Sequence, residues 1–237
     1  MQVLILTTNT IHHTYFVKKL TKLNIEINVI CERRRIKYPF STFHKFEKKR
    51  DQYEKKKWFK KKISILKQSK SLQFVDNINS LDPKKLNFSK YKIIFVFGIG
   101  ILKKKFLSKI KSHILNFHGG NPEKYRGLDS HLWAIRNKDF KNFTVTLHKL
   151  ITEVDKGKIL FKKKINLYKN MKLYQLRKIN TEICVELAKK VINLLKNKKS
   201  LNFKKQKKVG KYYSAMNSDQ KNICNIAFSN YTKKLNG

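Results

Sequence analysis

Two short runs of apolar residues constrain the fold of this chain more than any other feature. Gln2–Leu6 near the start and Ile93–Phe97 near the middle consist almost entirely of β-prone apolar residues. Strands of this kind are typical of a parallel sheet that is buried on both faces. A helical pattern follows each run, which predicts βαβ units with right-handed crossovers.

Hydrophobic spacing indicates the remaining elements. Apolar residues at four-residue spacing predict a long helix that begins near Met171. Further helices are expected at about 10–23, 102–110 and 130–136, and further strands at about 25–30, 113–116, 143–147 and 159–161. We therefore predict an α/β fold with a Rossmann-like open, mostly parallel sheet flanked by helices. In such sheets ligands bind beyond the carboxyl ends of the strands.

The length of 237 residues suits one domain with a short appendage. We expect a catalytic domain over residues 1–200 and a short, basic C-terminal extension over residues 201–237.

The formal net charge of +41 is far from the usual balance and raises the possibility of nucleic-acid binding. However, the lysines are spread along the whole chain, which favours a general residue bias over a binding patch. In the segment 42–62 the lysines alternate with aromatic residues. We interpret it as a surface helix with one aromatic side; the alternative is a basic lid over an anionic substrate.

Three cysteines, Cys31, Cys184 and Cys224, lie far apart and show no metal-binding spacing. No apolar run approaches the ~18 residues that span a bilayer, and the first residues are not typical of a signal peptide. We expect a cytoplasmic protein without a membrane partner.

Polar side chains follow two of the predicted strands. Asn116 and His118 lie two residues apart and so share one face of a strand, where an amide and an imidazole can hold a carbonyl oxygen as it becomes an oxyanion. Asp155, on a turn that ends in Gly157, can accept a proton or hold His118 in position. Neither segment is specific alone.

The order of the motifs is more specific. Asn-x-His is followed by Tyr-Arg-Gly, Trp-Ala-Ile, Thr-x-x-x-His and Asp-x-Gly-x-Ile. This pattern resembles the folate-dependent formyltransferase family, which includes the methionyl-tRNA, glycinamide ribonucleotide and sugar N-formyltransferases. The matching residues are Asn116, His118, Tyr125, Arg126, Gly127, Trp133, Ala134, Ile135, Thr144, His148, Asp155, Gly157 and Ile159.

The resemblance implies catalytic roles for three of these residues. Asn116 would hydrogen-bond the formyl oxygen, His118 would stabilise the tetrahedral oxyanion, and Asp155 would steer the amine proton away. The pteridine of 10-formyltetrahydrofolate would bind at two loops, formed by Gly98, Ile99, Gly100, Ile101 and Leu102 and by Asp155, Lys156 and Gly157. No metal is implied, and no histidine pair has metal-binding spacing.

The residues that would bind the acceptor have two interpretations each. Tyr125, Arg126, Gly127 and Trp133 are candidates for substrate binding, although the first three can also form a simple turn and Trp133 can face the core. We interpret His148 as a satisfied strand-end residue, and leave open whether Tyr212 and Tyr213 bind or pack.

Two departures from the family pattern affect the loops. Gly119-Gly120-Asn121-Pro122 stands where many relatives have Pro-Ser-Leu-Leu-Pro, so we expect a more flexible loop. Lys156 replaces a residue that is commonly small, which leaves the folate contacts there undefined.

Three acceptor classes compete within this resemblance. The loop after the first strand, Thr7–His12, has no glycine with which to cradle the phosphate of glycinamide ribonucleotide. About forty residues follow the long helix, too few for the C-terminal β-rich domain of the methionyl-tRNA enzymes. We therefore favour a nucleotide-linked amino sugar, drawn to a basic cleft, with tRNA as the alternative. A non-catalytic RNA- or folate-binding protein on the same scaffold is a further alternative, and a homodimer is expected only by analogy.

Overall fold

The structure, a computed structural model, describes residues 1–33, 37–59, 71–82 and 86–236. The far end of the predicted segment 42–62, from residue 60 onward, lies outside the described residues.

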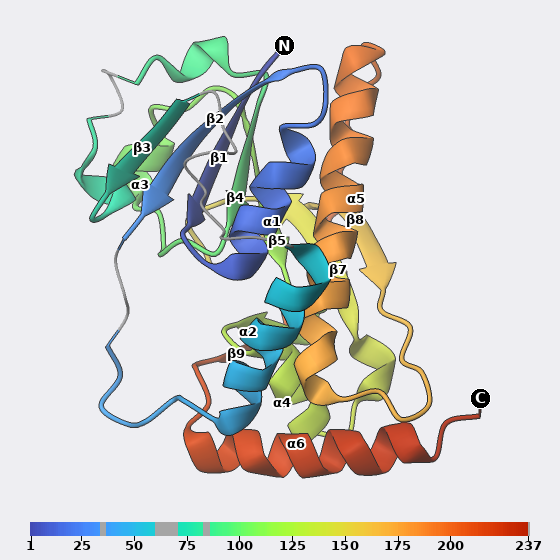
Figure 1. Ribbon diagram of the computed structural model, residues 1–237. Helices are drawn as coiled ribbons and strands as arrows, with labels where there is room; N and C mark the ends of the chain where they lie inside the picture. Colours follow the sequence, from blue (N-terminus) through green and yellow to red (C-terminus); the bar gives the residue numbers. More distant parts are fainter. Residues whose placement is uncertain (34–36, 60–70, 83–85, 237) are drawn as a thin grey trace.

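A seven-stranded sheet forms the centre of the molecule (Figure 1). Its strands run in the order β3-β2-β1-β4-β5-β7-β8. The bounds are β1 Gln2–Thr8, β2 Glu26–Glu32, β3 Ser71–Val75, β4 Ile93–Phe97, β5 His113–His118, β7 Thr144–Lys149 and β8 Ile159–Lys164. The first five strands in chain order are parallel, whereas β7 pairs antiparallel with both of its neighbours, β5 and β8. The prediction of an open, mostly parallel sheet flanked by helices is confirmed.

The two faces of the sheet pack into different core layers. Along β4, Ile93, Phe95 and Phe97 belong to one buried cluster, while Ile94 and Val96 belong to the other. This alternation explains why the strand is apolar at every position, because successive side chains point to opposite faces and both faces are covered.

The larger cluster lies under the long helices. It includes buried residues of α1 (Ile11–Leu20), α4 (Ser130–Arg136) and α5 (Leu176–Lys196). The smaller cluster lies under short elements, η2 (Ile78–Ser80), η3 (Phe88–Lys90) and α3 (Lys104–Leu107). Of the other 3-10 turns, η4 is Phe140–Asn142 and η5 is Leu173–Gln175. We call these sides of the sheet the helical side and the short-element side.

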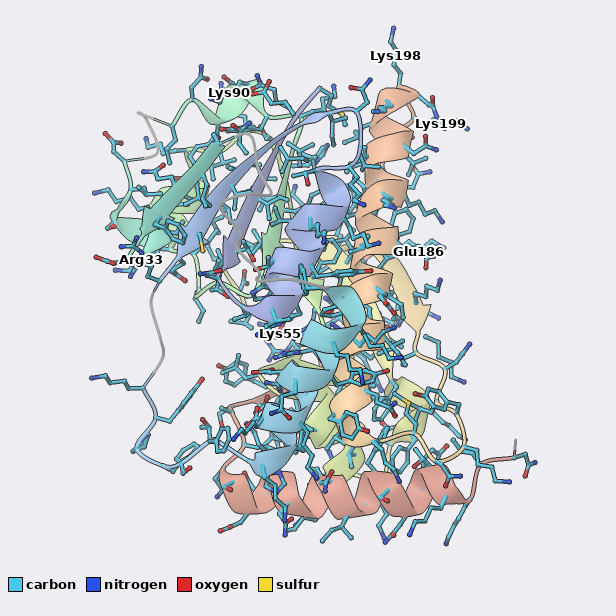
Figure 2. The ribbon with its side chains drawn as sticks, viewed as in Figure 1. Arg33, Lys55, Lys90, Glu186, Lys198 and Lys199 are labelled. Carbon is cyan, nitrogen blue, oxygen red and sulfur yellow. The ribbon has the colours of Figure 1, made fainter. Side chains whose placement is uncertain are left out.

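The segment after β2 contains α2 (Lys45–Trp58), as predicted for a surface helix. Its aromatic side faces the protein: Phe46 is buried and Trp58 stacks on Tyr15 with ring centroids 4.2 Å apart. Its lysines are exposed, and Lys55 extends outward in Figure 2.

The C-terminal segment contains more structure than the sequence suggested. β9 (Lys211–Tyr213) pairs with β6 (Tyr125–Gly127) in a small parallel sheet, and α6 (Ser218–Lys233) runs along the end of the molecule next to α4 (Figure 1). Cys224 and Phe228 on α6 are fully buried. Polar residues alternate with these few apolar ones, and the sequence pattern therefore did not reveal the helix.

Three other details differ from expectation. β3 was not predicted, because it is a short strand at the edge of the sheet. The helix expected at 102–110 is limited to α3, since Lys103 is extended and precedes its first turn. β5 continues two residues beyond Asn116, which places His118 inside the strand.

Exposed lysines lie at the outer edge of the fold. Lys90, Lys198 and Lys199 are exposed, and Figure 2 shows them at the outer edge of the molecule. No helix among the described residues combines the length and the apolar character needed to cross a membrane.

Candidate functional site

Four polar side chains converge where β5 and β7 meet. Asn116 and His118 come from β5 and His148 comes from β7, directly across from Asn116 in the antiparallel register. Asp155 comes from the turn between β7 and β8. Its Oδ1 accepts a bond from Asn116 Nδ2 at 3.3 Å and lies 3.2 Å from His148 Nε2, while its Oδ2 lies 3.3 Å from His118 Nδ1. The structure thus brings the three predicted catalytic residues together and adds His148.

Asp155 is held as a carboxylate by these neighbours. Burial opposes its ionisation, but His118, His148 and the backbone N–H of Gly127, which donates to Oδ2 at 2.8 Å, together lower its pKa to about 2. Asp155 is buried, and its backbone has a positive φ of 55°. The surrounding contacts stabilise this left-handed backbone conformation. Asp155 is therefore an anion at neutral pH.

His118 is buried and both of its ring nitrogens face acceptors. Nε2 donates to the carbonyl of Tyr125 at 2.8 Å, and Nδ1 faces Asp155. Burial lowers the pKa of His118, and the opposing attraction of Asp155 only partly compensates. Direct contact with a substrate oxygen requires that the bond to Tyr125 be exchanged for it.

His148 is part of this group as well as a strand residue. It is buried, Nδ1 lies 3.0 Å from the carbonyl of Lys149, and Nε2 faces both Asp155 and Asn116. Its bond to Lys149 agrees with the interpretation as a satisfied strand residue. Its place beside Asp155 was not predicted, because the sequence spacing does not reveal pairing across two strands.

The predicted loop after β4, Gly98–Leu102, is fixed by two residues from distant segments. The buried carboxylate of Glu32, at the end of β2, accepts the N–H of Gly100 at 2.8 Å and the N–H of Ile78 at 3.1 Å. Asn79 donates to the carbonyl of Ile101 at 2.9 Å and accepts the N–H of Lys103 at 2.7 Å. These bonds hold the backbone of the loop in one conformation.

Gly98 and Gly157 are required by close packing. A Cβ on Gly98 would lie 2.2 Å from Cε1 of His13, and a Cβ on Gly157 would lie 1.6 Å from the carbonyl oxygen of Lys149. Gln206 donates to the carbonyls of Asp155 and Gly157, at 2.7 and 2.9 Å. Lys156, between them, is exposed.

Three predicted acceptor residues are in β6, and their side chains have structural partners. Tyr125 donates to Asp139 at 3.0 Å, and Arg126 donates to the carbonyls of Gly210 and Val154 at 2.6 and 3.0 Å. Trp133 donates to the carbonyl of Ser214 and stacks on Tyr213. Gly127 contributes its backbone to Asp155, as described above.

Hydrogen bonds hold the loop 119–122 in place. Gly120 accepts a bond from Thr146 Oγ1 at 2.8 Å, and a Cβ there would lie 2.7 Å from Cβ of Ser130. Asn121 donates to Asn142 at 2.7 Å, and its carbonyl accepts the N–H groups of Lys124 and Tyr125. The loop is therefore hydrogen-bonded at Gly120 and Asn121, and its greater flexibility stays a prediction.

A cavity of about 550 Å³ joins these features. Of the predicted residues it is lined by Asn116, His118, Asp155, the loop Gly98–Leu102 and Gly127. Lys156, Gly157, Tyr125, Arg126 and Trp133 are not among the lining residues. Tyr212, half exposed, does line the cavity, whereas Tyr213 packs on Trp133.

The individual residues of the helical side of the cavity were not singled out from the sequence, which offered the segment 42–62 only as an alternative basic lid. Its wall includes Glu47 and Arg50 of α2 and Arg177 of α5, with His12 and His13 from the start of α1. Burial lowers the pKa of His13 to about 3, so this histidine is neutral. The sequence of the Lys-rich helix α2 does not indicate which of its charged residues face the cavity.

In the described part of the chain, no group of three or more His, Cys, Asp or Glu is placed to hold an ion. All three cysteines are buried and free. The donor set around Asp155 is used in hydrogen bonds between its own members.

Comparisons with known proteins identify the family of the chain. The sequence model of the formyl transferase family matches residues 45–183. A search of curated protein sequences finds no significant match.

Several solved structures share the fold. A 4-N formyltransferase from Francisella tularensis is 16% identical, with a TM-score of 0.61, covering 95% of this chain and 86% of that one. A sugar N-formyltransferase from a Shewanella species is 16% identical, with a TM-score of 0.60 and coverages of 96% and 87%. The formyltransferase PseJ from Anoxybacillus kamchatkensis, solved with UDP-4,6-dideoxy-4-formamido-L-AltNAc and tetrahydrofolate, is 16% identical, with a TM-score of 0.56 and coverages of 90% and 86%.

The family match covers more than half of the chain and includes Asn116, His118 and Asp155. The chain therefore belongs to the formyl transferase family and is a formyltransferase.

Proposed function

We propose that this protein transfers a formyl group from 10-formyltetrahydrofolate to the primary amine of a nucleotide-linked amino sugar. The observation that carries the proposal is the cluster of Asn116, His118, His148 and Asp155 at the edge of a cavity large enough for small ligands. Preorganised donors next to a fixed carboxylate suit a reaction that passes through a tetrahedral oxyanion.

In the proposed reaction the acceptor amine attacks the formyl carbon, and a C–N bond forms while the carbonyl oxygen becomes an oxyanion. Asn116 Nδ2 and His118 Nε2 donate to that oxygen, the latter after exchanging its bond with Tyr125. The bond from the formyl carbon to N10 of the folate then breaks. The proton lost by the amine passes through the cluster of His118, His148 and Asp155 to N10. Until then, the ionised carboxylate of Asp155 stabilises the positive charge on the attacking amine nitrogen.

We propose that the folate binds on the short-element side of the sheet. Ile99, Leu102 and Leu150 of the cavity wall belong to or pack against the core layer on that side. Gly98–Leu102, held by Glu32 and Asn79, would offer backbone groups to the pteridine, together with the turn at Asp155–Gly157.

The acceptor class rests on two observations. The fold neighbours include sugar N-formyltransferases, one of them solved with a nucleotide-linked formamido sugar and tetrahydrofolate. The cavity volume also suits small molecules. Tyr125, Arg126, Gly127 and Trp133 would act by shaping β6 and its neighbours, since their side chains are engaged elsewhere.

The test is an assay of formyl transfer from 10-formyltetrahydrofolate to a panel of nucleotide-linked amino sugars, with methionyl-tRNA and glycinamide ribonucleotide alongside. Formation of tetrahydrofolate with one amino sugar supports the proposal. Turnover with the tRNA alone would favour the alternative of a methionyl-tRNA formyltransferase-like enzyme, which the high positive charge of the chain suggests.

A cytoplasmic location and a homodimer remain part of the proposal. Light scattering of the purified protein measures its mass in solution. A mass equal to that of one chain would contradict the dimer.

A further inference from the structure

The charged groups of the cavity wall differ from those of the rest of the chain. Lysine and arginine together number 56, of which only seven are arginine. Among the described lining residues, however, there is no lysine, and the permanent cations are Arg50 and Arg177. The acidic lining residues are Glu47, Asp129, Glu153 and Asp155. The described wall therefore carries more acidic than permanently cationic side chains despite the net charge of +41, and the expected basic cleft is absent from it.

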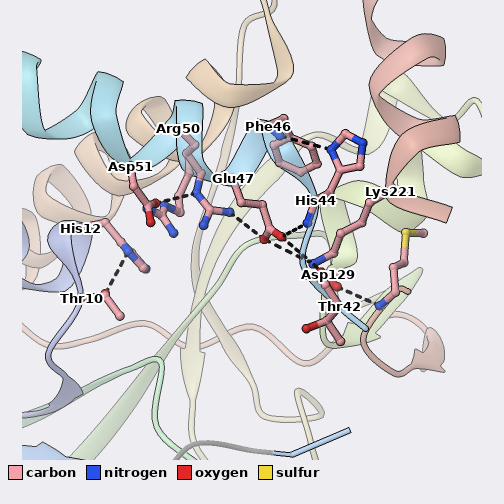
Figure 3. Close-up of polar contacts among 12 residues, drawn as sticks. Thr10, His12, Thr42, His44, Phe46, Glu47, Arg50, Asp51, Asp129 and Lys221 are labelled. Atoms are coloured by element: carbon pink, nitrogen blue, oxygen red, sulfur yellow. Dashed lines mark hydrogen bonds and ion pairs between the residues drawn. The ribbon is translucent and has the colours of Figure 1, made fainter. Parts of the chain in front are cut away.

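Three carboxylates hold the two arginines in place. Arg177 donates from Nε to Glu54 at 2.9 Å and from Nη2 to both Glu54 and Asp51 at 2.6 Å. Arg50 donates from Nε to Asp51 and from Nη1 to Glu47, each at 3.2 Å. Asp51 thus bridges α2 and α5, and Figure 3 shows Arg50 and Glu47 extending from α2 on the same side of the helix.

The acids are themselves anchored. Glu54 is fully buried, and Glu47 accepts the backbone N–H of His44 at 3.0 Å and two contacts from the buried Lys221 of α6 at 3.3 Å (Figure 3). Such support fixes the guanidinium groups before a ligand arrives, which lowers the entropy cost of binding.

Each guanidinium keeps donors for a ligand. A guanidinium has five N–H groups. Among the described residues, none is hydrogen-bonded to Nη2 of Arg50 or to Nη1 of Arg177. Planar forks of this kind suit phosphate oxygens.

The pair lies across the sheet from the proposed folate loops. Phe46, Leu173 and Leu176, which line the cavity beside the arginines, belong to the core layer of the helical side. Leu102 belongs to the layer of the short-element side. The cavity therefore passes around the carboxyl edge of the sheet, with the arginines on the side away from the folate.

The choice of arginine over lysine also has a chemical reason. A lysine side chain is a primary amine, the same group that the acceptor presents to the formyl donor. Arginine stays protonated and is not a competing nucleophile.

Because the proposed acceptor carries a diphosphate, this inference rests on the proposed function and deepens it. We propose that Arg50 and Arg177 form the subsite that holds the phosphate or diphosphate of the acceptor and so determine its class.

The experiment compares the wild type with Arg50→Ala, Arg50→Lys and, as a matched control on the outer face of the same helix, Lys55→Ala. Arg177 is left intact because its removal would leave the buried Glu54 unpaired. Thermal unfolding checks that each variant folds. Titration calorimetry with inorganic pyrophosphate and with uridine diphosphate measures binding without any need for turnover.

We expect Arg50→Ala to weaken binding of both probes about tenfold or more, as loss of a charge-assisted hydrogen bond predicts. Arg50→Lys should recover part of the loss, and Lys55→Ala should bind as the wild type does. In the formyl-transfer assay Arg50→Ala should raise the KM of the acceptor and leave the KM of the folate unchanged.

Equal binding by Arg50→Ala and Lys55→Ala would overturn the inference, as would a wild type that binds neither probe. A rise in the folate KM alone would also overturn it, because the anion held would then be the folate tail. Probe binding through Arg50 in a protein that transfers no formyl group would leave this subsite standing and refute the proposed function.

Discussion

The carboxylate of Asp155 organises the site, since it contacts an amide, two imidazoles and a backbone N–H within 3.3 Å. A group in so many contacts acts as a unit with its neighbours, and removal of one member leaves others unpaired.

Asn116 is the member whose replacement tests the oxyanion role most cleanly. Its side chain is partly exposed, so Asn116→Ala should unfold near the wild-type temperature. Loss of one oxyanion donor is expected to lower kcat by ~10²–10³-fold. Asn230→Ala, at an exposed position on α6, is the control and should leave kcat unchanged. Equal rates for the two variants would rule out the role of Asn116.

The lowered pKa values of the buried His13 and the partly buried His131 predict how the free energy of unfolding depends on pH. Burial lowers the pKa of His13 to about 3 and of His131 to about 4, below the ordinary 6.5. The unfolded chain binds protons at these groups before the folded chain does, so their contribution is fully present above pH 6.5 and is lost as the pH falls toward 4. Each group removes up to about 1.4 kcal/mol per pH unit.

Urea unfolding at pH 7 and pH 5 measures this loss, and we expect a clearly lower free energy of unfolding at pH 5. The pKa of Asp155, at about 2, adds a further loss only between about pH 4 and 2. An unfolding free energy that does not change between pH 7 and 5 would contradict the burial of these histidines in the neutral form.

Catalytic residues that stand in a linear motif could be predicted from the sequence. Asn116, His118 and Asp155 stand in recognisable spacing, and the structure places them together. His148 stands in the Thr-x-x-x-His motif, but its contact with Asp155 was not predicted. Glu32, Arg50 and Arg177 meet the site through tertiary contacts between separate segments, and no spacing along the chain reports such contacts.

The elements that carry the site are the loop after β4 and the helices of the opposite wall. The loop depends on Glu32 and Asn79, which come from β2 and η2. We regard them as positioning residues, because they bond the loop backbone and not the reacting atoms.

Glu32→Gln tests the positioning of the loop. An amide oxygen can replace one carboxylate oxygen, but the amide nitrogen cannot accept the second N–H, and an unpaired buried N–H costs ~1–3 kcal/mol. We expect the KM of the folate to rise about tenfold, with kcat at saturating folate nearly unchanged. Glu186→Gln, in an exposed pair with Lys163, is the control. A fall in kcat without a change in folate KM would contradict a positioning role.

Strongly periodic or uniformly apolar elements were predictable. β1, β4 and α5 follow directly from hydrophobic pattern. β3 and β9 are short strands, and α6 buries few apolar side chains among many polar ones, so their local patterns are weak. Tertiary packing, rather than local pattern, stabilises these elements.

At the scale of the whole molecule, the C-terminal segment packs against the remainder of the fold. We propose the division into a catalytic domain of residues 1–200 and an extension of residues 201–237 that packs onto it. Lys221 of the extension contacts Glu47 of the cavity wall, and Gln206 bonds the turn of Asp155. The extension therefore reaches both walls of the cavity.

Phe228→Ala tests how strongly the extension is bound. Phe228 is fully buried, so its truncation should lower the free energy of unfolding by ~3–5 kcal/mol. Ile226→Ala on the same helix removes a half-exposed side chain and should have little effect. Denaturant unfolding of both variants decides the question, and equal stabilities would show that α6 is not part of the folded core.

The central claim is that this fold and this cluster transfer a formyl group to a sugar amine. The most direct measurement is the amount of tetrahydrofolate and formamido sugar formed from 10-formyltetrahydrofolate and nucleotide-linked amino sugars, by wild type and by Asn116→Ala. The account predicts equal amounts of the two products with at least one sugar for the wild type, and a loss of ~10²–10³-fold in rate for the variant. Formylation of methionyl-tRNA or glycinamide ribonucleotide alone, or equal rates for the two proteins, would contradict it.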